Sequence, residues 1–301
     1  MSETTPSTIN TNFDLKTQQP AETNYVMHRR FDRMGRLIGD GAMEKLFRSH
    51  VMVIGLGGVG SWVAESLARS GVGRITVIDH DEICITNANR QLHALQGLVG
   101  KKKAQMVAER LRKINPQANI KEQVMFYNAE NSEAILSGGE FGAPDFIIDC
   151  IDNLTAKCHL LATARTRGLP IITSAGAAAR MNPLATKLTD LANTHTDPLA
   201  HQVRKILRSR HEFPAKGEFG IPCVFSEEIP MMPEELKYDN GEGFKCVCPQ
   251  GQDNPHSCDR RNRIYGTASF VTGTFGLVMV SHVIQALVKP HLQQKEVTQW
   301  E

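Results

Sequence analysis

The sequence predicts an α/β fold in which helices cover both faces of a doubly wound, mainly parallel sheet. Short β-branched apolar runs, such as residues 50–55 and 144–152, alternate with longer stretches of helical apolar spacing. Parallel strands need a crossover between them, so this alternation is typical of strand–helix–strand units. With 301 residues, 41% of them hydrophobic, the chain can cover both faces of such a sheet.

The elements follow in a regular order. A short amphipathic helix is expected over 36–48, ahead of the first buried strand. Gly71 closes the first crossover helix, and Pro116 ends the second. The predicted strands are 50–55, 74–79, 144–152, 169–176 and 184–191, and the predicted helices after the first are 59–71, 101–115, 153–168 and 197–210.

The composition also divides the chain. Residues 1–28 are polar and are expected to be a disordered tail, and 291–301 a second tail. A core over 29–183 continues into 184–290 as part of the same domain. Glycine, proline and charge accumulate over 210–263, which predicts a mobile surface loop.

Residues 266–288 form an apolar stretch as long as a membrane span. Polar residues such as Thr272 and His282, and three glycines, dilute it, and no second span accompanies it. A buried helix behind the sheet is therefore favoured over a membrane helix.

A glycine fingerprint follows the first strand. Gly55, Gly57 and Gly60 have the G-x-G-x-x-G spacing, with Gly58 between them, and Asp79 lies 24 residues after Gly55. Glycines allow a tight turn and close approach to phosphate, and a carboxylate at the next strand can bind ribose. The pattern predicts a Rossmann-like nucleotide site, and NAD and ATP would both satisfy it.

Residues further along favour ATP. Asp81, Asn87, Arg90 and Gln91 come next, then Lys103, and Asp152 follows a later strand. Cleavage of ATP at its α-phosphate needs cations for the developing charge and a carboxylate for Mg²⁺. Hydride transfer to NAD leaves these groups unexplained.

Each residue also has a simpler interpretation. Lys103 lies in a lysine run that could be a solvated helix start, Asp152 could cap the next helix, and Arg90 could lie on the surface. All three interpretations holding together behind a glycine loop is less plausible than a common site.

The glycine loop, Asp79, "N-x-x-R-Q" at 87–91, "VGKKKA" at 99–104 and "DCIDN" at 149–153 together resemble the ThiF/MoeB/ubiquitin-activating superfamily of adenylating enzymes. This resemblance runs from about residue 30 to 180 and implies an ATP-binding adenylation core over 29–183. It implies that Asp79 binds ribose, Asn87 and Arg90 approach the phosphates, Lys103 stabilises the leaving group and Asp152 holds Mg²⁺. The ATP-binding residues implied in total are Gly55, Gly57, Gly58, Gly60, Asp79, Asp81, Asn87, Arg90, Gln91 and Lys103.

The same resemblance implies a homodimer. An arginine near the N-terminus of these enzymes crosses the dimer interface to the partner's ATP. In "RFDRMGR" Arg33 is the closest match, and Arg36 is the alternative. The implied catalytic residues are then Arg33, Arg90, Lys103 and Asp152.

The second half of the chain resembles one branch of this superfamily. "TDLANTHTDPLA" at 189–200, "CVFSEE" at 223–228 and "FGLVMVSHVI" at 275–284 are similar to the tRNA threonylcarbamoyladenosine dehydratases, the TcdA/CsdL branch. The resemblance implies ATP-dependent adenylation of the threonyl carboxylate next to the anticodon, followed by closure to a cyclic hydantoin. The sequence departs from the branch over 228–263, which is longer and carries an extra C-x-C.

A tRNA substrate would need cationic contacts. The net charge of +2 neither requires nor excludes nucleic acid, so any basic surface must be local. Runs of basic residues are more often solvated faces of a protein than nucleic-acid sites. A tRNA substrate nevertheless makes the basic runs of this chain candidates for tRNA binding. The candidate tRNA-binding residues are Arg204, Lys205, Arg208, Arg260, Arg261 and Arg263.

The cysteines separate two rival functions. An activating enzyme for a ubiquitin-like or sulfur-carrier protein typically holds zinc through two C-x-x-C pairs, which this chain lacks. Cys246, Cys248 and Cys258 do not have zinc spacing. Cys223 is the best-placed nucleophile, although a buried thiol is the more common interpretation.

Three further expectations remain open. A nucleotide-binding scaffold without catalysis is the second rival and leaves Arg90, Lys103 and Asp152 unexplained. A cysteine desulfurase is a candidate sulfur-relay partner that the sequence does not identify. The thiols and the polar N-terminus favour a cytoplasmic protein with no obligate membrane partner.

Overall fold

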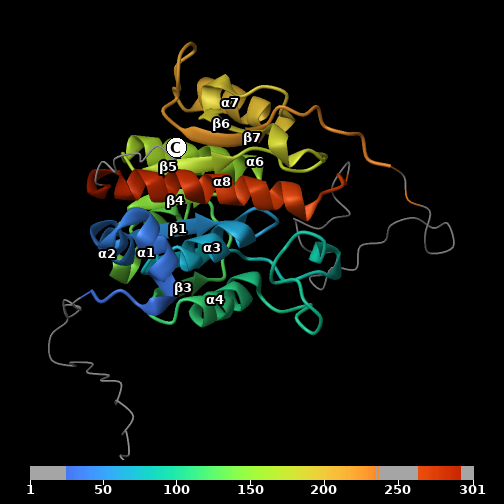
Figure 1. Ribbon diagram of the computed structural model, residues 1–301. Coiled ribbons are helices and arrows are strands. Elements are labelled where there is room, and N and C mark those ends of the chain that lie inside the picture. The colour runs from blue at the N-terminus through green and yellow to red at the C-terminus, as the bar shows by residue number, and fades with distance from the viewer. Residues whose placement is uncertain (1–24, 235, 237–263, 293–301) are drawn as a thin grey trace, which may run out of the picture.

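The computed structural model describes residues 25–234, 236 and 264–292. Its centre is a seven-stranded sheet in the order β3-β2-β1-β4-β5-β7-β6 (Figure 1). All neighbours pair in parallel except β6 and β7, which pair antiparallel. The strands are β1 His50–Ile54, β2 Arg74–Ile78, β3 Asn119–Gln123, β4 Phe146–Asp149, β5 Ile171–Ser174, β6 Thr186–Asp190 and β7 Pro222–Ser226.

Helices cover both faces of the sheet, as the sequence predicts. The helices are α1 Asp32–Ile38, α2 Asp40–Arg48, α3 Gly60–Arg69, α4 Lys103–Ile114, α5 Ser132–Leu136, α6 Leu154–Thr166, α7 Pro198–Arg210 and α8 Ser269–Val288. Alternate residues of β1 supply the two cores: Val51 and Val53 pack with α3, α4 and α8, while Met52 and Ile54 pack with α6 and α7. The period of two along a strand produces this division.

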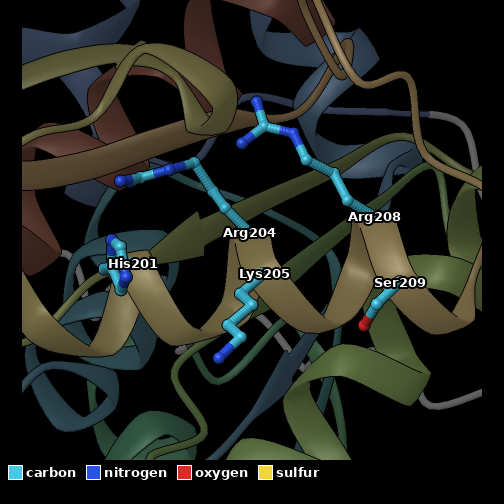
Figure 2. A pocket seen from close by; sticks show the side chains of 5 residues that line it. All are labelled: His201, Arg204, Lys205, Arg208 and Ser209. Carbon is cyan, nitrogen blue, oxygen red and sulfur yellow. The ribbon is translucent and has the colours of Figure 1, made fainter.

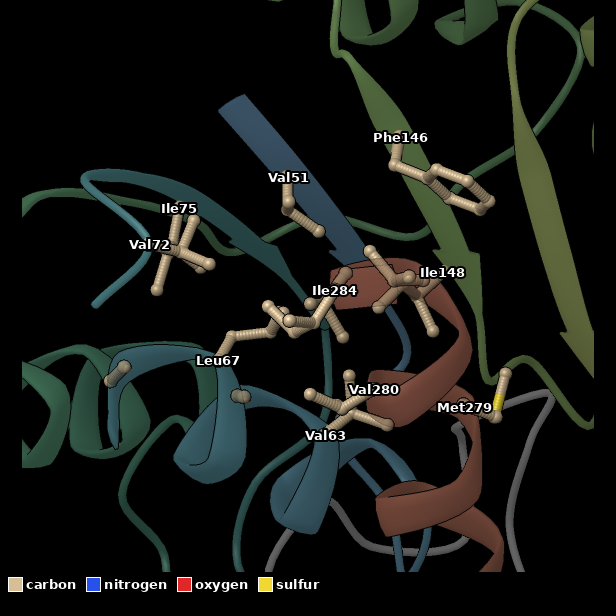
Figure 3. Close-up of a cluster of buried hydrophobic side chains, with 14 of the residues drawn as sticks. Val51, Val63, Leu67, Val72, Ile75, Phe146, Ile148, Met279, Val280 and Ile284 are labelled. Carbon is tan, nitrogen blue, oxygen red and sulfur yellow. The ribbon is translucent and has the colours of Figure 1, made fainter. Parts of the chain in front are cut away.

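Helix α8 lies along one face of the sheet (Figures 1 and 3). Met279, Val280 and Ile284 pack against Ile148 and neighbouring sheet residues. Residues 269–291 are long and apolar enough to cross a membrane, but 61% of the apolar window is buried inside the protein. The predicted buried helix is confirmed.

Two glycines let α8 approach α3 closely. A β-carbon at Gly276 would lie 2.9 Å from the carbonyl oxygen of Val59, and one at Gly273 would lie 3.3 Å from the ring of Trp62. These contacts place α8 against the helix that begins in the glycine fingerprint. The apolar stretch therefore helps to position the predicted nucleotide loop.

Some local predictions differ from the structure. The helix expected over 36–48 is two helices, because Gly39 has a φ of 88° and interrupts it. The prediction of a mobile loop over 210–263 is wrong where β7 forms. This strand lies between β5 and β6 in the sheet, and its Cys223 and Val224 are fully buried. At the end of the tail expected over 1–28, Tyr25 and Met27 pack against the core instead of being disordered. The rest of the two expected tails, 1–24 and 293–301, and residues 235 and 237–263 of the loop lie outside the described residues.

The strand order reverses between β1 and β4. Chain connections run toward β3 on one side of this point and toward β6 on the other. In doubly wound sheets, ligands bind at the carboxyl ends of the strands at such a reversal. The loops that follow β1, β2, β4 and β5 therefore form the candidate site.

Candidate active site

The glycine turn between β1 and α3 is tightly constrained. Gly55 has a φ of 92°, and a β-carbon there would lie 2.7 Å from the carbonyl oxygen of Cys150. A β-carbon at Gly60 would lie 1.8 Å from the carbonyl oxygen of Gly55. Only glycine fits either position. The turn brings the N-terminus of α3 to the carboxyl edge of the sheet, where its N–H groups can meet an anion.

Asp79 holds this turn from the end of β2. Its Oδ2 accepts a hydrogen bond of 2.7 Å from the backbone N–H of Leu56, and its Oδ1 accepts one of 2.8 Å from that of Asp81. Burial raises the pKa of the Asp79 carboxyl, and the charge of Asp81 adds to this effect against the opposing charge of Lys103. The predicted ribose acid lies beside the glycine loop.

Lys103 lies at the same edge, at the start of α4. Its Nζ lies 2.7 Å from Oδ2 of Asp81, and its backbone N–H donates to the carbonyl of Asp81. Burial alone would lower the pKa of the Lys103 ammonium, but the charges of Asp79, Asp81 and Asp152 outweigh it and raise this pKa. Lys103 is therefore a buried, charged lysine, which rules out the solvated helix start.

The segment 85–92 covers the glycine turn. A β-carbon at Gly58 would lie 3.2 Å from Cδ of Arg90, so the arginine stem crosses the turn. The indole N–H of Trp62 donates to the carbonyl of Arg90 at 3.2 Å and fixes that backbone. Asn87 has a local role: its Oδ1 accepts from the backbone N–H of Cys84 at 3.1 Å.

Asp152 is exposed just after β4, and it does not cap α6. The cap is Asn153, whose Oδ1 accepts from the backbone N–H of Ala156 at 3.0 Å. The Asp152 carboxylate is thus not used to start the helix. Burial alone would lower the pKa of Lys103, and the charge of Asp152 opposes this with a smaller effect than the charges of Asp79 and Asp81.

Arg33 is not part of this cluster within one chain. Its neighbour Phe31 packs against Gly71, beyond the C-terminal end of α3, whereas the glycine turn precedes that helix. Ten helical residues separate the two ends by about 15 Å. In Figure 1, α1 lies at the left of the sheet, and the loop between β2 and α4 extends to the right. The Arg33 side chain is 93% exposed.

The basic residues of α7 form a separate surface. Together with His201 and Ser209, Arg204, Lys205 and Arg208 line a hollow of about 500 Å³ (Figure 2). Arg204 donates to the hydroxyl of Thr194, and the guanidinium of Arg208 lies 5.0 Å from the ring centroid of Phe219. The other predicted tRNA-binding residues, Arg260, Arg261 and Arg263, lie outside the described residues.

Sequence reasoning missed three groups of polar side chains near the carboxyl edge of the sheet. Lys157 and Asp149 form a fully buried ion pair of 2.5 Å. Arg180 and Asp197 form another, of 3.3 Å, and Asp197 also caps α7. The third is His93, which contacts Gln91. The Asp197-Pro198 pair is a helix-start signal that could have indicated the cap, whereas Lys157 carries no local signal.

Cys223, the thiol that the sequence favours as a nucleophile, lies in β7. Cys223 is fully buried, and this burial raises the pKa of its thiol. A buried neutral thiol is a poor nucleophile. The buried interpretation is therefore favoured for Cys223, and Cys246, Cys248 and Cys258 lie outside the described residues.

Comparison with known proteins agrees with this arrangement. A sequence model of the ThiF family matches residues 31–300. The chain belongs to the ThiF family. Within it, the chain is 38% identical to the tRNA threonylcarbamoyladenosine dehydratase of Escherichia coli K12 over 88% of this chain and 96% of that protein. The corresponding Bacillus subtilis 168 protein is 36% identical over 87% and 96% of the two chains.

Solved structures of this ThiF branch have the same fold. The E. coli dehydratase TcdA in complex with ATP aligns with a TM-score of 0.73 and 36% identity, covering 89% of this chain and 97% of that one. The complex with AMP aligns with a TM-score of 0.74. The resemblance and the fold class predicted from sequence are confirmed, and these relatives favour ATP over NAD.

Proposed function

We propose that this protein is an ATP-dependent tRNA threonylcarbamoyladenosine dehydratase. The observation that carries the proposal is the buried Lys103 beside the glycine turn, in a chain similar to TcdA over nearly the whole TcdA length. A buried cation that keeps its charge suits an enzyme that meets developing negative charge on phosphates. A scaffold that only binds a nucleotide has no need of it.

The proposed reaction has two steps. An oxygen of the threonyl carboxylate attacks the α-phosphorus of ATP, and the bond to the bridging oxygen breaks as pyrophosphate leaves. A urea nitrogen of the same modified base then attacks the activated carbonyl carbon, loses its proton, and displaces AMP. Over both steps the base loses the atoms of one water, and these atoms leave with AMP and pyrophosphate. The second step is intramolecular, so positioning replaces an enzyme nucleophile.

The chain's own residues have proposed roles in the first step. Arg90, whose stem crosses Gly58, is proposed to bind the phosphates, and Lys103 to stabilise the leaving pyrophosphate. Asp79 is proposed to bind ribose. Asn87 has its oxygen engaged by Cys84, so its proposed phosphate contact would use the amide nitrogen.

A magnesium site fits the carboxyl edge. Asp152 offers an exposed carboxylate whose charge reaches Lys103, and oxygen ligands of this kind suit Mg²⁺. We propose that Asp152 holds the ion, which when bound neutralises phosphate charge. Ligand atoms of Asp79, His80 and Asp81 also lie within 4.8 Å of one another, but Asp79 and Asp81 are engaged by backbone N–H groups and Lys103.

A homodimer would bring Arg33 to a site. Because Arg33 is remote from the glycine turn of its own chain, any contact with ATP must come from a partner copy. Mixing Arg33→Ala with Asp152→Ala protein should then restore activity, since one site of each hybrid dimer has both residues. No recovery after proven subunit exchange would remove Arg33 from the mechanism, and Arg36→Ala is the matched control.

The tRNA is proposed to contact α7. Lys205 and Arg208 are exposed on this helix, and phosphate contacts dominate affinity for nucleic acids. Charge reversal of both should weaken tRNA binding and leave ATP binding unchanged. A lack of any change in tRNA affinity would move the tRNA surface elsewhere.

Pyrophosphate exchange tests the acceptor class. Exchange between labelled pyrophosphate and ATP is expected with tRNA that carries threonylcarbamoyladenosine, and not with the same tRNA lacking this modification. Exchange supported by a di-glycine-ended carrier protein instead would identify an activating enzyme. A cysteine desulfurase partner is a separate proposal, and sulfur transfer to this chain would be its test.

A further inference from the structure

Gln91 and His93 form a buried pair beside the glycine turn. Nε2 of the His93 imidazole lies 3.0 Å from Oε1 of Gln91, and the two residues are 2% and 6% exposed, respectively. A β-carbon at Gly57 would lie 4.0 Å from Nε2 of Gln91. The amide of Gln91 therefore has His93 on one side and the phosphate turn on the other.

The imidazole is neutral. Burial lowers the pKa of His93 to about 3, and the charges of Lys103 and Arg110 act in the same direction. A neutral imidazole carries one N–H. Within the described residues, Nδ1 of His93 is buried without a hydrogen-bond partner, so Nε2 makes the one polar contact of the ring.

Two arrangements of this contact can be compared. If Nε2–H of His93 donates to Oε1 of Gln91, the amide NH₂ faces Gly57 and the orphaned Nδ1 is an acceptor. If the amide is reversed, its oxygen faces Gly57 and His93 buries an unpaired N–H donor. The second arrangement leaves an orphaned donor and turns a carbonyl dipole against phosphate, so the first is favoured.

We propose that His93 is a positioning residue that turns the amide NH₂ of Gln91 toward the nucleotide phosphates at Gly57. The inference deepens the proposed function and rests on its ATP site. His93 acts through Gln91 and does not itself touch the nucleotide. The backbone N–H of Leu92 donates to Oγ of Ser61 at 3.4 Å, which ties the segment between the two side chains to α3.

Two amide substitutions at His93 separate positioning from packing. In His93→Gln the new amide nitrogen can take the place of Nε2, whereas in His93→Asn it overlays Nδ1 and cannot reach Gln91. The dissociation constant of ATP with Mg²⁺ is measured by calorimetry on the full-length protein, beside the thermal midpoint. We expect His93→Asn to bind ATP about tenfold more weakly, the effect of losing one hydrogen bond to a charged group, and His93→Gln to stay near wild type.

A double-mutant cycle with Gln91→Leu completes the test. Once the Gln91 amide is gone, His93→Asn should cause no further loss of ATP affinity. Additive losses, or equal affinities of the Asn and Gln variants, would overturn the inference and leave the proposed function standing. Wild-type protein that binds no ATP with Mg²⁺ would overturn both.

Discussion

Nζ of Lys103 lies 2.7 Å from Oδ2 of Asp81, and this contact joins the start of α4 to the segment after β2. The lysine side chain is 7% exposed and the aspartate side chain 35% exposed. Asp81 thus compensates a buried ammonium while its own carboxylate reaches solvent. An incoming phosphate can share this ammonium without first dehydrating it.

Removing the ammonium should cost activity more than folding. We expect Lys103→Met to slow pyrophosphate exchange by about 100-fold or more, the usual effect of losing one preorganised donor to developing charge. Lys103→Arg keeps the charge and is the matched control. If Lys103→Met retained wild-type exchange in a folded protein, the lysine would be a structural residue only.

Asp152 and Asn153 are adjacent, and substitutions at the two positions should affect different properties: the rate of adenylation at Asp152 and the stability of the fold at Asn153. Asp152→Asn should leave the free energy of unfolding near wild type and slow adenylation by about 100-fold, since a carboxylate that holds Mg²⁺ contributes mainly to the transition state. Asn153→Ala removes the α6 cap and should cost about 1 kcal/mol of stability with little effect on rate. Urea unfolding and pyrophosphate release measure the two effects. Normal release by Asp152→Asn would mean that another residue holds the metal.

None of the cysteines should be needed for ring closure. Cys223 is the strictest case because it is the thiol that the sequence favours as a nucleophile, and it is buried in β7 beside Thr173 of β5. Cys223→Ser should keep most of its dehydratase activity after correction for lost stability, since the acyl-adenylate already has a good leaving group. Severe loss in a folded variant, together with a thioester trapped for mass spectrometry, would require a covalent mechanism.

Acid should destabilise the fold through His50. Its Nδ1–H donates to the carbonyl of Gly142 at 3.1 Å, and burial lowers its pKa from 6.5 to about 4. Between these pH values the unfolded chain binds more protons, so the contribution is complete above pH 6.5 and is lost as the pH falls toward 4. From pH 7 to 5, wild type should lose about 2 kcal/mol more than His50→Asn in urea unfolding. Parallel pH profiles of the two proteins would contradict this.

The parts of the site that sequence could predict are those encoded by local spacing. The glycine turn, Asp79 at the end of the next strand, and Lys103 at a helix start all follow from their position relative to an apolar strand or a helix. Because the strands are parallel, their carboxyl ends meet at one edge of the sheet, and these three features therefore lie close together there. The strands β1, β2, β4 and β5 were predictable for the same reason, since each is short, apolar and β-branched.

The strands that sequence could not predict depend on distant partners. β3 reads "NIKEQ" and is a strand because it pairs with β2, and β7 fills a place between β5 and β6 inside a stretch with loop composition. Neither strand can be read from a local pattern, because each depends on its neighbours in the sheet. The Asn87–Cys84 and Asn153–Ala156 hydrogen bonds are different: each joins residues only three apart, so they are local contacts that the sequence analysis did not identify.

The most direct test of the proposed chemistry is the mass of the modified nucleoside. Unmodified or threonylcarbamoyladenosine-bearing tRNA is incubated with the protein, ATP and Mg²⁺, digested under mild conditions, and examined by mass spectrometry. The proposal predicts that threonylcarbamoyladenosine loses the mass of one water, only when ATP is present, with one AMP formed per base converted. Lys103→Met protein should convert it about 100-fold more slowly. Threonylcarbamoyladenosine that keeps its mass while wild-type protein turns over ATP would contradict it.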